Sequence, residues 1–203
     1  MSRALAPSWT GPGRQLTVSG RTVAKVERLV AELGVGAEAA SWQDAAERAD
    51  VVLLGVHWAG VDDALTQAGA DDETLAGKVI VDCGNPVEVE RFTLVDPGRS
   101  LTQRVHDRTG AHLVKAFNLC HAQVWRHVPG YYGRTLRVPI AGDPTAKQLV
   151  SQLVTDVGAE PLDVGGLEHT PYLEAMAAVV IRLLFSGADP TTTFNIVQDP
   201  TVG

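Results

Sequence analysis

The sequence predicts an α/β protein with a doubly wound parallel sheet and a small C-terminal α/β lobe. Short apolar segments typical of buried strands, such as residues 51–56 and 78–86, alternate with segments that have the apolar spacing of amphipathic helices. The connections between the predicted strands up to residue 118 are long enough for parallel crossovers. This alternation favours a parallel sheet with helices on both faces.

The first half of the chain supplies most of this pattern. A strand at 15–19 is followed by a helix at 22–33, which Thr22 caps and Gly34 ends. Ser41 and Ser100 are predicted to cap two further helices, and residues 87–98 are predicted to form a loop. The remaining elements are strands at 37–41, 51–56, 78–86 and 112–118, and helices at 42–49, 61–68 and 101–108.

After Tyr131–Arg134 the pattern of predicted strands and helices changes to that of a smaller unit. We therefore divide the chain into a domain at 1–135 and a small lobe with a tail at 136–203. The lobe is predicted to pack on the sheet and to hold strands at 136–142 and 160–164 and helices at 144–158 and 167–185. The last helix is apolar over most of its circumference. One face can be buried on the sheet, and the other indicates either a dimer contact or a deeper core beneath the tail.

Composition excludes several classes of function. The net charge of −7 argues against nucleic acid or an anionic membrane as the main partner. No apolar segment reaches the ~20 residues that a membrane span needs, and no signal peptide is evident. The two cysteines, Cys83 and Cys120, are too few for a disulfide scaffold. We therefore expect a cytoplasmic protein. We expect no metal site, because the spacing of Cys120, His121, His127 and His112 matches no standard zinc pattern.

A Rossmann-like sheet carries its first strand at the centre and joins it to the first helix through a G-x-G-x-x-G/A turn. Residues 2–9 (SRALAPSW) have the pattern of that helix, but no such strand or turn precedes them. The GPGR at 11–14 precedes a strand and is not this turn. Either the true start lies upstream, with Ser2 at the third-glycine position, or the sheet lacks its central strand. We favour the first alternative, because each unpaired buried backbone group costs about 1–3 kcal/mol.

The end of the strand at 15–19 favours NADP over NAD. NAD-binding folds place a carboxylate at this position for the ribose hydroxyl, whereas NADP-binding folds use small polar residues and arginine for the 2′-phosphate. This chain has Ser19, Gly20, Arg21 and Thr22 here, with Lys25 one turn into the helix, and no carboxylate. Alternatively, Thr22 serves only as a helix cap and Arg21 is only a solvated charge.

The segments SRALAPSW, LTVSGR, ADVVLLGVHW, GKVIVDCGNP, HLVKAFN and VPIAGD occur in an order and spacing that resemble the F420-dependent NADP oxidoreductase family. The resemblance extends to about Phe185. It implies a cytoplasmic homodimer that transfers a hydride between NADP(H) and the deazaflavin coenzyme F420. A related domain of membrane ferric reductases reduces flavin, so flavin is an alternative acceptor.

The resemblance also implies roles for individual residues at the carboxyl ends of the strands. Val56, His57 and Trp58 would line the nicotinamide, Asn85 and Pro86 would shape the next strand end, and Lys115, Phe117 and Asn118 would approach the nicotinamide and the acceptor. For four of these residues the sequence leaves a structural alternative open. His57 could be a turn residue, Trp58 a core aromatic, and Asn118 a polar cap at the strand end. Lys115 could be the partner of Asp82 in a salt bridge.

We therefore predict an NADPH-dependent oxidoreductase in which the protein supplies binding and alignment and the cofactors supply the chemistry. The sequence leaves two other functions open. One is an NADP(H)-binding regulatory protein without turnover. The other is an inactive truncated fragment.

Overall fold

The computed structural model describes residues 1–126, 128 and 135–188. His127, the change of pattern at Tyr131–Arg134 and most of the predicted tail lie outside these residues. Five strands form one sheet in the order β3-β4-β7-β8-β9, in which β7 and β8 are antiparallel and the other neighbours are parallel. They are β3 (Val51–Leu54), β4 (Val79–Asp82), β7 (His112–Lys115), β8 (Arg137–Gly142) and β9 (Glu160–Asp163).

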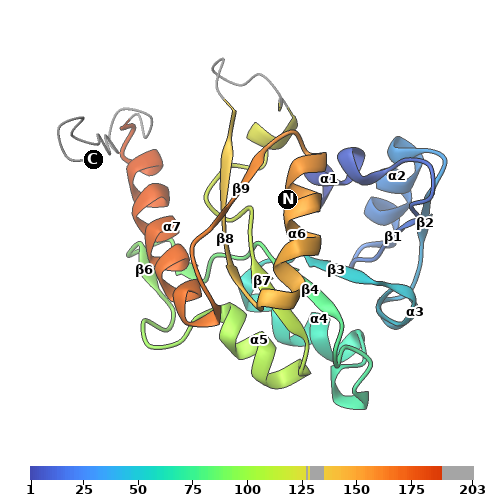
Figure 1. Cartoon of the computed structure of the whole chain (residues 1–203), viewed down its shortest axis with the longest axis horizontal. Coiled ribbons are helices and arrows are strands. Elements are labelled where there is room, and N and C mark those ends of the chain that lie inside the picture. The colour runs from blue at the N-terminus through green and yellow to red at the C-terminus, as the bar shows by residue number, and fades with distance from the viewer. Residues whose placement is uncertain (127, 129–134, 189–203) are drawn as a thin grey trace.

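A separate sheet of two parallel strands, β1 (Leu16–Val18) and β2 (Ala37–Ala39), lies beyond β3. Within the described residues, neither of its strands is hydrogen-bonded to β3. In Figure 1 these two strands stand with α2 and α3 at the opposite end of the molecule from α7. The hydrogen-bonded sheet is thus interrupted between β1 and β3, at the position where a Rossmann-like sheet carries its first strand.

Helices cover both faces of the larger sheet because its strands are apolar on both sides (Figure 1). Ile80 and Leu113 pack with α4 and α5, whereas Val81 and Val114 face a second cluster that includes α6 and the N-terminal helices. All four side chains are fully buried. The α-helices are α1 (Ser2–Leu5), α2 (Val23–Leu33), α3 (Trp42–Arg48), α4 (Val61–Gln67), α5 (Leu101–Thr109), α6 (Pro144–Asp156) and α7 (Thr170–Phe185).

The helix ends predicted at Gly34, Ser41 and Ser100 are confirmed. The Ser41 hydroxyl accepts a hydrogen bond from the Asp44 backbone N–H, and Ser100 forms a complete capping box with Gln103 at the start of α5. Helix α2 begins after Thr22, although the Thr22 side chain makes no capping hydrogen bond, and it ends at Gly34. Gly34 has a positive φ of 75°, which glycine adopts without a steric penalty.

Two features differ from the prediction. The predicted loop at 87–98 contains a short hairpin of β5 (Val87–Glu88) and β6 (Thr93–Leu94), too short for a periodic signal. The strands of the predicted lobe also extend the main sheet through β8 instead of packing on it. No helix within the described residues has the length and apolar character that a membrane crossing requires.

We predict that Leu113→Ala lowers the free energy of unfolding by about 2–5 kcal/mol, because it removes a fully buried side chain from the centre of the sheet. Leu162→Ala on the edge strand β9 is the matched control. Leu162 is 41% exposed, and its loss is expected to cost less than about 1 kcal/mol. Denaturant unfolding measures both variants, and equal losses would contradict the assignment of the core.

Candidate functional site

The turn after β1 presents the basic residues that the sequence assigns to a phosphate. The Ser19 hydroxyl lies 2.8 Å and 2.9 Å from the carbonyl oxygens of Ala40 and Ser41, so it ties the turn to the end of β2. Gly20 packs close to Val26 of α2. Arg21, Thr22 and Lys25 are exposed at the start of this helix. Within the described residues, neither basic side chain has an ion-pair partner, so both can contact an anion.

The carboxyl end of β3 leads into the segment Val56–Trp58. His57 is exposed, and its ring Nδ1 accepts a weak hydrogen bond from the Ala59 backbone N–H at 3.3 Å. Trp58 is half-buried beside His57, with their ring centroids 5.4 Å apart. Val56 and Trp58 also pack on the core cluster of α4 and α5. His57 therefore caps a turn, as one sequence alternative expects, and its ring remains accessible.

Two asparagines join the carboxyl ends of β4 and β7. The Asn85 amide donates to the Asn118 carbonyl at 2.7 Å, and the Asn118 amide donates to Asn85 Oδ1 at 3.0 Å and to the Leu173 carbonyl at 3.1 Å. Asn118 is 4% exposed, and among the described residues its own Oδ1 has no hydrogen-bond partner. Pro86 is buried directly after Asn85. An unpaired buried acceptor is costly, which marks this atom as available to a donor.

Phe117 lies in the core and does not face this edge. Its side chain is 1% exposed and makes edge-to-face contacts with Trp9 and Trp125, with ring centroids at 5.9 Å and 5.2 Å. Its φ of 62° is unusual for a non-glycine residue and turns the chain sharply at the end of β7. Phe117 thus shapes the edge through its backbone, whereas the resemblance implied an approach to the ligand.

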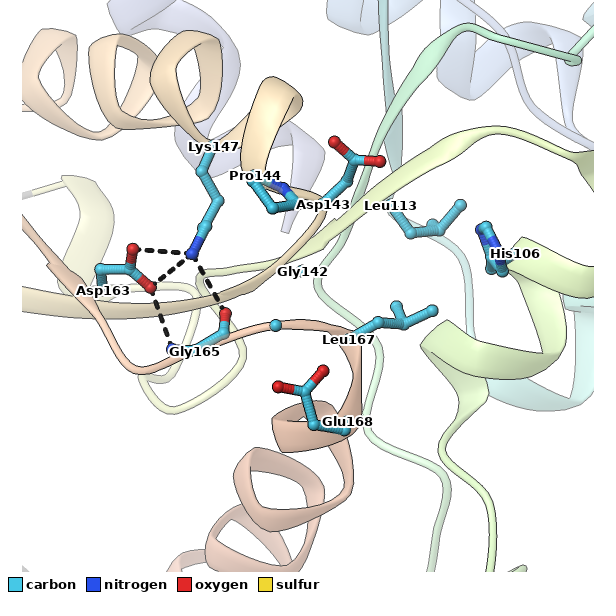
Figure 2. A pocket seen from close by; sticks show the side chains of 11 residues that line it. His106, Leu113, Gly142, Asp143, Pro144, Lys147, Asp163, Gly165, Leu167 and Glu168 are labelled. Atoms are coloured by element: carbon cyan, nitrogen blue, oxygen red, sulfur yellow. Dashed lines mark hydrogen bonds and ion pairs between the residues drawn. The ribbon is translucent and has the colours of Figure 1, made fainter.

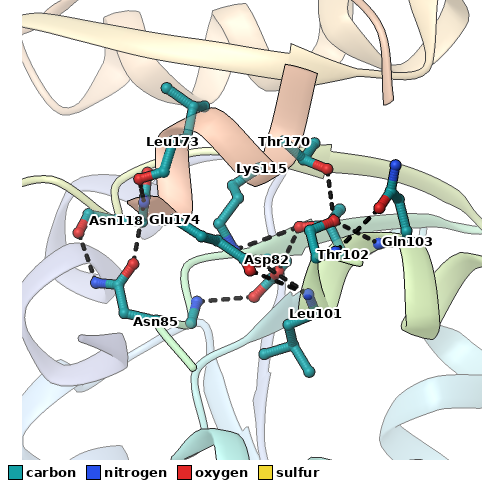
Figure 3. A network of polar contacts seen from close by, with 12 residues as sticks. Asp82, Asn85, Leu101, Thr102, Gln103, Lys115, Asn118, Thr170, Leu173 and Glu174 are labelled. Carbon is teal, nitrogen blue, oxygen red and sulfur yellow. Dashed lines mark hydrogen bonds and ion pairs between the residues drawn. The ribbon is translucent and has the colours of Figure 1, made fainter. Parts of the chain in front are cut away.

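Lys115 lies in a buried ionic network, shown in Figure 3. Its ammonium donates to Asp82 Oδ2 at 2.8 Å, to Glu174 Oε1 at 2.7 Å and to the Thr102 hydroxyl at 3.3 Å. All four residues are fully buried. The salt bridge with Asp82, one alternative from the sequence, is confirmed. Because these contacts use all three donors of the ammonium, direct contact between Lys115 and a ligand is not favoured.

Electrostatics explain why this network is stable in the core. Burial alone would lower the pKa of Lys115, but the adjacent charges and hydrogen bonds of Asp82 and Glu174 raise the pKa above its ordinary value. Burial raises the pKa of Glu174, and Lys115 opposes that rise. Both oxygens of Glu174 also lie within 3.2 Å of the Leu101 backbone N–H at the start of α5. The positive end of this helix therefore compensates part of the second negative charge.

Sequence reasoning missed Glu174 and Thr102. Glu174 is the only charged residue between positions 170 and 181, within an otherwise apolar helix. A lone carboxylate in such a segment indicates a buried partner, so this signal was present in the sequence. Thr102 carries no comparable signal, because a threonine near a helix start is usually solvated.

A cavity of about 770 Å³ lies at the other end of β7, where α6 begins (Figure 2). Leu113 and Leu167 form its apolar wall, and Asp143, Lys147 and Glu168 lie around it. The Lys147 ammonium contacts both oxygens of Asp163 at 2.7 Å. None of the predicted site residues lines this cavity. The predicted residues lie instead at the carboxyl ends of β1, β3, β4 and β7, where open α/β sheets bind ligands.

Comparison with known proteins supports the sequence resemblance. Residues 1–86 match the family described as NADP oxidoreductase, coenzyme F420-dependent. The chain is 29% identical over 194 residues to the metalloreductase STEAP3 of Rattus norvegicus, an alignment that covers 94% of this chain and 36% of that protein. The chain thus spans only about a third of the length of this curated relative.

Solved structures share the fold. The chain is 25% identical to a candidate F420-dependent NADP reductase from Arthrobacter sp. FB24, with a TM-score of 0.80 and coverage of 92% of this chain and 90% of the other. An imine reductase from Myxococcus stipitatus in complex with NADP⁺ is 20% identical, with a TM-score of 0.67 and coverage of 92% and 60%. These findings confirm the Rossmann-like fold class and support an NADP-dependent oxidoreductase family.

We predict that Lys115→Ala lowers the free energy of unfolding by about 3–5 kcal/mol, because it leaves two buried carboxylates without their cation. Arg137→Ala is the control. It removes an exposed ion pair with Glu160, and its expected cost is below about 1 kcal/mol. Denaturant unfolding at neutral pH compares the two variants. A Lys115→Ala protein of wild-type stability would contradict the network.

Proposed function

We propose that this protein transfers a hydride between NADP(H) and a deazaflavin, coenzyme F420, or a flavin. The observation that carries the proposal is the turn at Ser19–Thr22, which follows β1 and has no carboxylate. Its Arg21 and the nearby Lys25 are exposed and have no ion-pair partner in the part of the chain that the structure describes. The match of residues 1–86 to an NADP oxidoreductase family supports the same cofactor. It favours an oxidoreductase over a regulatory protein without turnover.

In this proposal, Arg21 and Lys25 contact the 2′-phosphate of NADP(H). The Ser19 and Thr22 hydroxyls and the backbone at Gly20 complete the binding turn. Arginine presents a planar set of donors that suits phosphate oxygens, and the start of α2 adds its own preference for an anion. Both charges are exposed, so binding costs little desolvation. NADH lacks this phosphate and would gain none of these contacts.

The nicotinamide would lie at the carboxyl ends of β3, β4 and β7. Val56, His57 and Trp58 would form one side of this position, and Asn85 and Pro86 the other. The unpaired Asn118 Oδ1 fits an amide N–H donor such as the nicotinamide carboxamide. The buried side chains of Lys115 and Phe117 would not contact the cofactor and would instead fix the strand end that carries Asn118.

The bound nicotinamide supplies the hydride chemistry, and the protein supplies orientation. F420 is the favoured acceptor because both the matching family and the Arthrobacter sp. FB24 structure carry that assignment. Flavin is the second candidate acceptor, because the sequence resemblance includes a flavin-reducing domain of membrane ferric reductases, and the curated relative is a metalloreductase. Titration with NADPH, with NADH as control, tests the cofactor. Assays of NADPH oxidation with F420 and with FMN then test the acceptor. We place this reaction in the cytoplasm.

We predict that Arg21→Ala weakens NADPH binding by about 10-fold or more, the scale of a lost charge-assisted hydrogen bond, and leaves NADH binding unchanged. Arg28→Ala is the matched control, because it removes an exposed charge of the same sign from a later turn of α2. Nicotinamide fluorescence measures all four affinities. An equal loss of NADPH and NADH affinity would refute the 2′-phosphate assignment.

We also propose a homodimer formed through α7. Tyr172, Met176 and Val179 are 69%, 45% and 50% exposed and follow one another at helical spacing, so they form one apolar face. A second copy of this helix would cover that face by a two-fold contact.

Met176→Glu is expected to shift the protein from dimer to monomer, because it places a charge in the proposed contact. Leu162→Glu, an exposed apolar residue on β9, is the control and should leave the dimer intact. Sedimentation equilibrium measures the mass of each variant. A wild-type monomer at all concentrations would rule out this dimer.

A further inference from the structure

We infer that Glu174, on the C-terminal helix α7, is a positioning residue for the strand edge at which we propose that the nicotinamide binds. The inference rests on the proposed function and goes beyond it, because it assigns a role to a helix that contributes none of the residues proposed to contact the cofactor. It depends on two paths of hydrogen bonds that join α7 to the two asparagines at this edge (Figure 3).

The first path begins at the Glu174 carboxylate. Its Oε1 lies 2.7 Å from Lys115 Nζ, which lies 2.8 Å from Asp82 Oδ2. The other oxygen of Asp82 accepts a hydrogen bond from the Gly84 backbone N–H at 2.7 Å. Glu174 is therefore connected through two charged side chains to the turn that presents Asn85.

The second path begins one residue earlier on the same helix. The Leu173 carbonyl accepts a hydrogen bond from the Asn118 amide at 3.1 Å, and Asn118 is bonded in turn to Asn85 at 3.0 Å. The two paths leave neighbouring residues of α7 and meet at Asn85 and Asn118. Two separate attachments limit both translation and rotation of the edge relative to the helix.

The chemistry of Glu174 favours a role in positioning its hydrogen-bond partners over a role in filling space. An apolar side chain could fill the same volume without the cost of burying a charge. A carboxylate adds defined contacts, because its oxygens accept from both the Lys115 ammonium and the Leu101 backbone N–H. Thr102 supports the same geometry, since its hydroxyl donates to Asp82 at 2.7 Å.

This edge is where precise placement matters for hydride transfer. The reaction needs the donor carbon and the acceptor to lie close together and aligned, and a shift of about 1 Å can lower the rate about 100-fold. The 2′-phosphate turn belongs to the separate β1–β2 sheet. A change at Glu174 should therefore affect the nicotinamide end of the cofactor and spare the adenosine end.

Glu174→Gln tests this inference. Glutamine keeps the volume of the side chain but has only one oxygen that can accept a hydrogen bond. Its amide N–H₂ would therefore face one of the two donors, either the Lys115 ammonium or the Leu101 backbone N–H. The kcat for NADPH oxidation with F420 is expected to fall about 10-fold or more. The enhancement of nicotinamide fluorescence on NADPH binding should fall with it. The Kd for 2′,5′-ADP, which carries the 2′-phosphate without a nicotinamide, should change by less than about 2-fold.

Two further variants separate positioning from folding. Glu160→Gln makes the same substitution at an exposed site on β9 and should change none of these values. Thr102→Val removes one buried hydroxyl without changing any charge. Its kcat should fall as well, by less than that of Glu174→Gln, whereas its Kd for 2′,5′-ADP should stay nearly unchanged. It therefore serves as the test if Glu174→Gln does not fold.

The failure of the positioning role can be distinguished from the failure of the proposed function. A folded Glu174→Gln protein with wild-type kcat and fluorescence overturns the inference and leaves the proposed function intact. So does an equal loss of 2′,5′-ADP affinity and turnover. If the wild-type chain binds neither NADPH nor 2′,5′-ADP, the proposed function fails and the positioning role fails with it.

Discussion

The buried ammonium of Lys115 is the interaction on which the carboxyl edge of the sheet depends. It lies beside Asp82 on the neighbouring parallel strand, because the two residues share a register position at the ends of β4 and β7. It also lies beside Glu174 of α7, far away in the sequence. Three buried charges sit between the sheet, the start of α5 and the C-terminal helix. Removing the ammonium would leave two buried carboxylates uncompensated, and removing either carboxylate would take away one of the acceptors of the ammonium.

This constraint relates the C-terminal helix α7 to the proposed cofactor site at the carboxyl ends of the strands. The basic turn after β1 holds the groups suited to the 2′-phosphate, whereas the asparagines at the ends of β4 and β7 hold the groups suited to the nicotinamide. A sheet that is interrupted between β1 and β3 separates the two. The network secures only the second of these regions, so in the proposed function binding selectivity and hydride alignment depend on different parts of the molecule.

Much of the fold could be predicted because the signals are local. The caps at Ser41 and Ser100 and the buried strands around Ile80 and Leu113 each follow from a few neighbouring residues. The hairpin at 87–94 was missed, because strands of two residues carry no periodicity.

The candidate site was less predictable because its contacts join distant segments. The Asp82–Lys115 pair could be inferred from two strand ends, but the contribution of Glu174 depends on how α7 packs. The burial of Phe117 depends on Trp9 and Trp125, which lie in other segments of the chain. Resemblance to a family suggested that Lys115 and Phe117 approach the ligand, whereas packing turns both side chains inward.

A crystal structure of the protein with NADP⁺ would show directly whether the two strand-end regions bind the two ends of one cofactor. We expect Arg21 and Lys25 within hydrogen-bond distance of the 2′-phosphate, and the carboxamide nitrogen of the nicotinamide within hydrogen-bond distance of Asn118 Oδ1. A cofactor bound in the cavity between Asp143 and Glu168 would refute this placement. So would a nicotinamide placed away from Asn85 and Asn118.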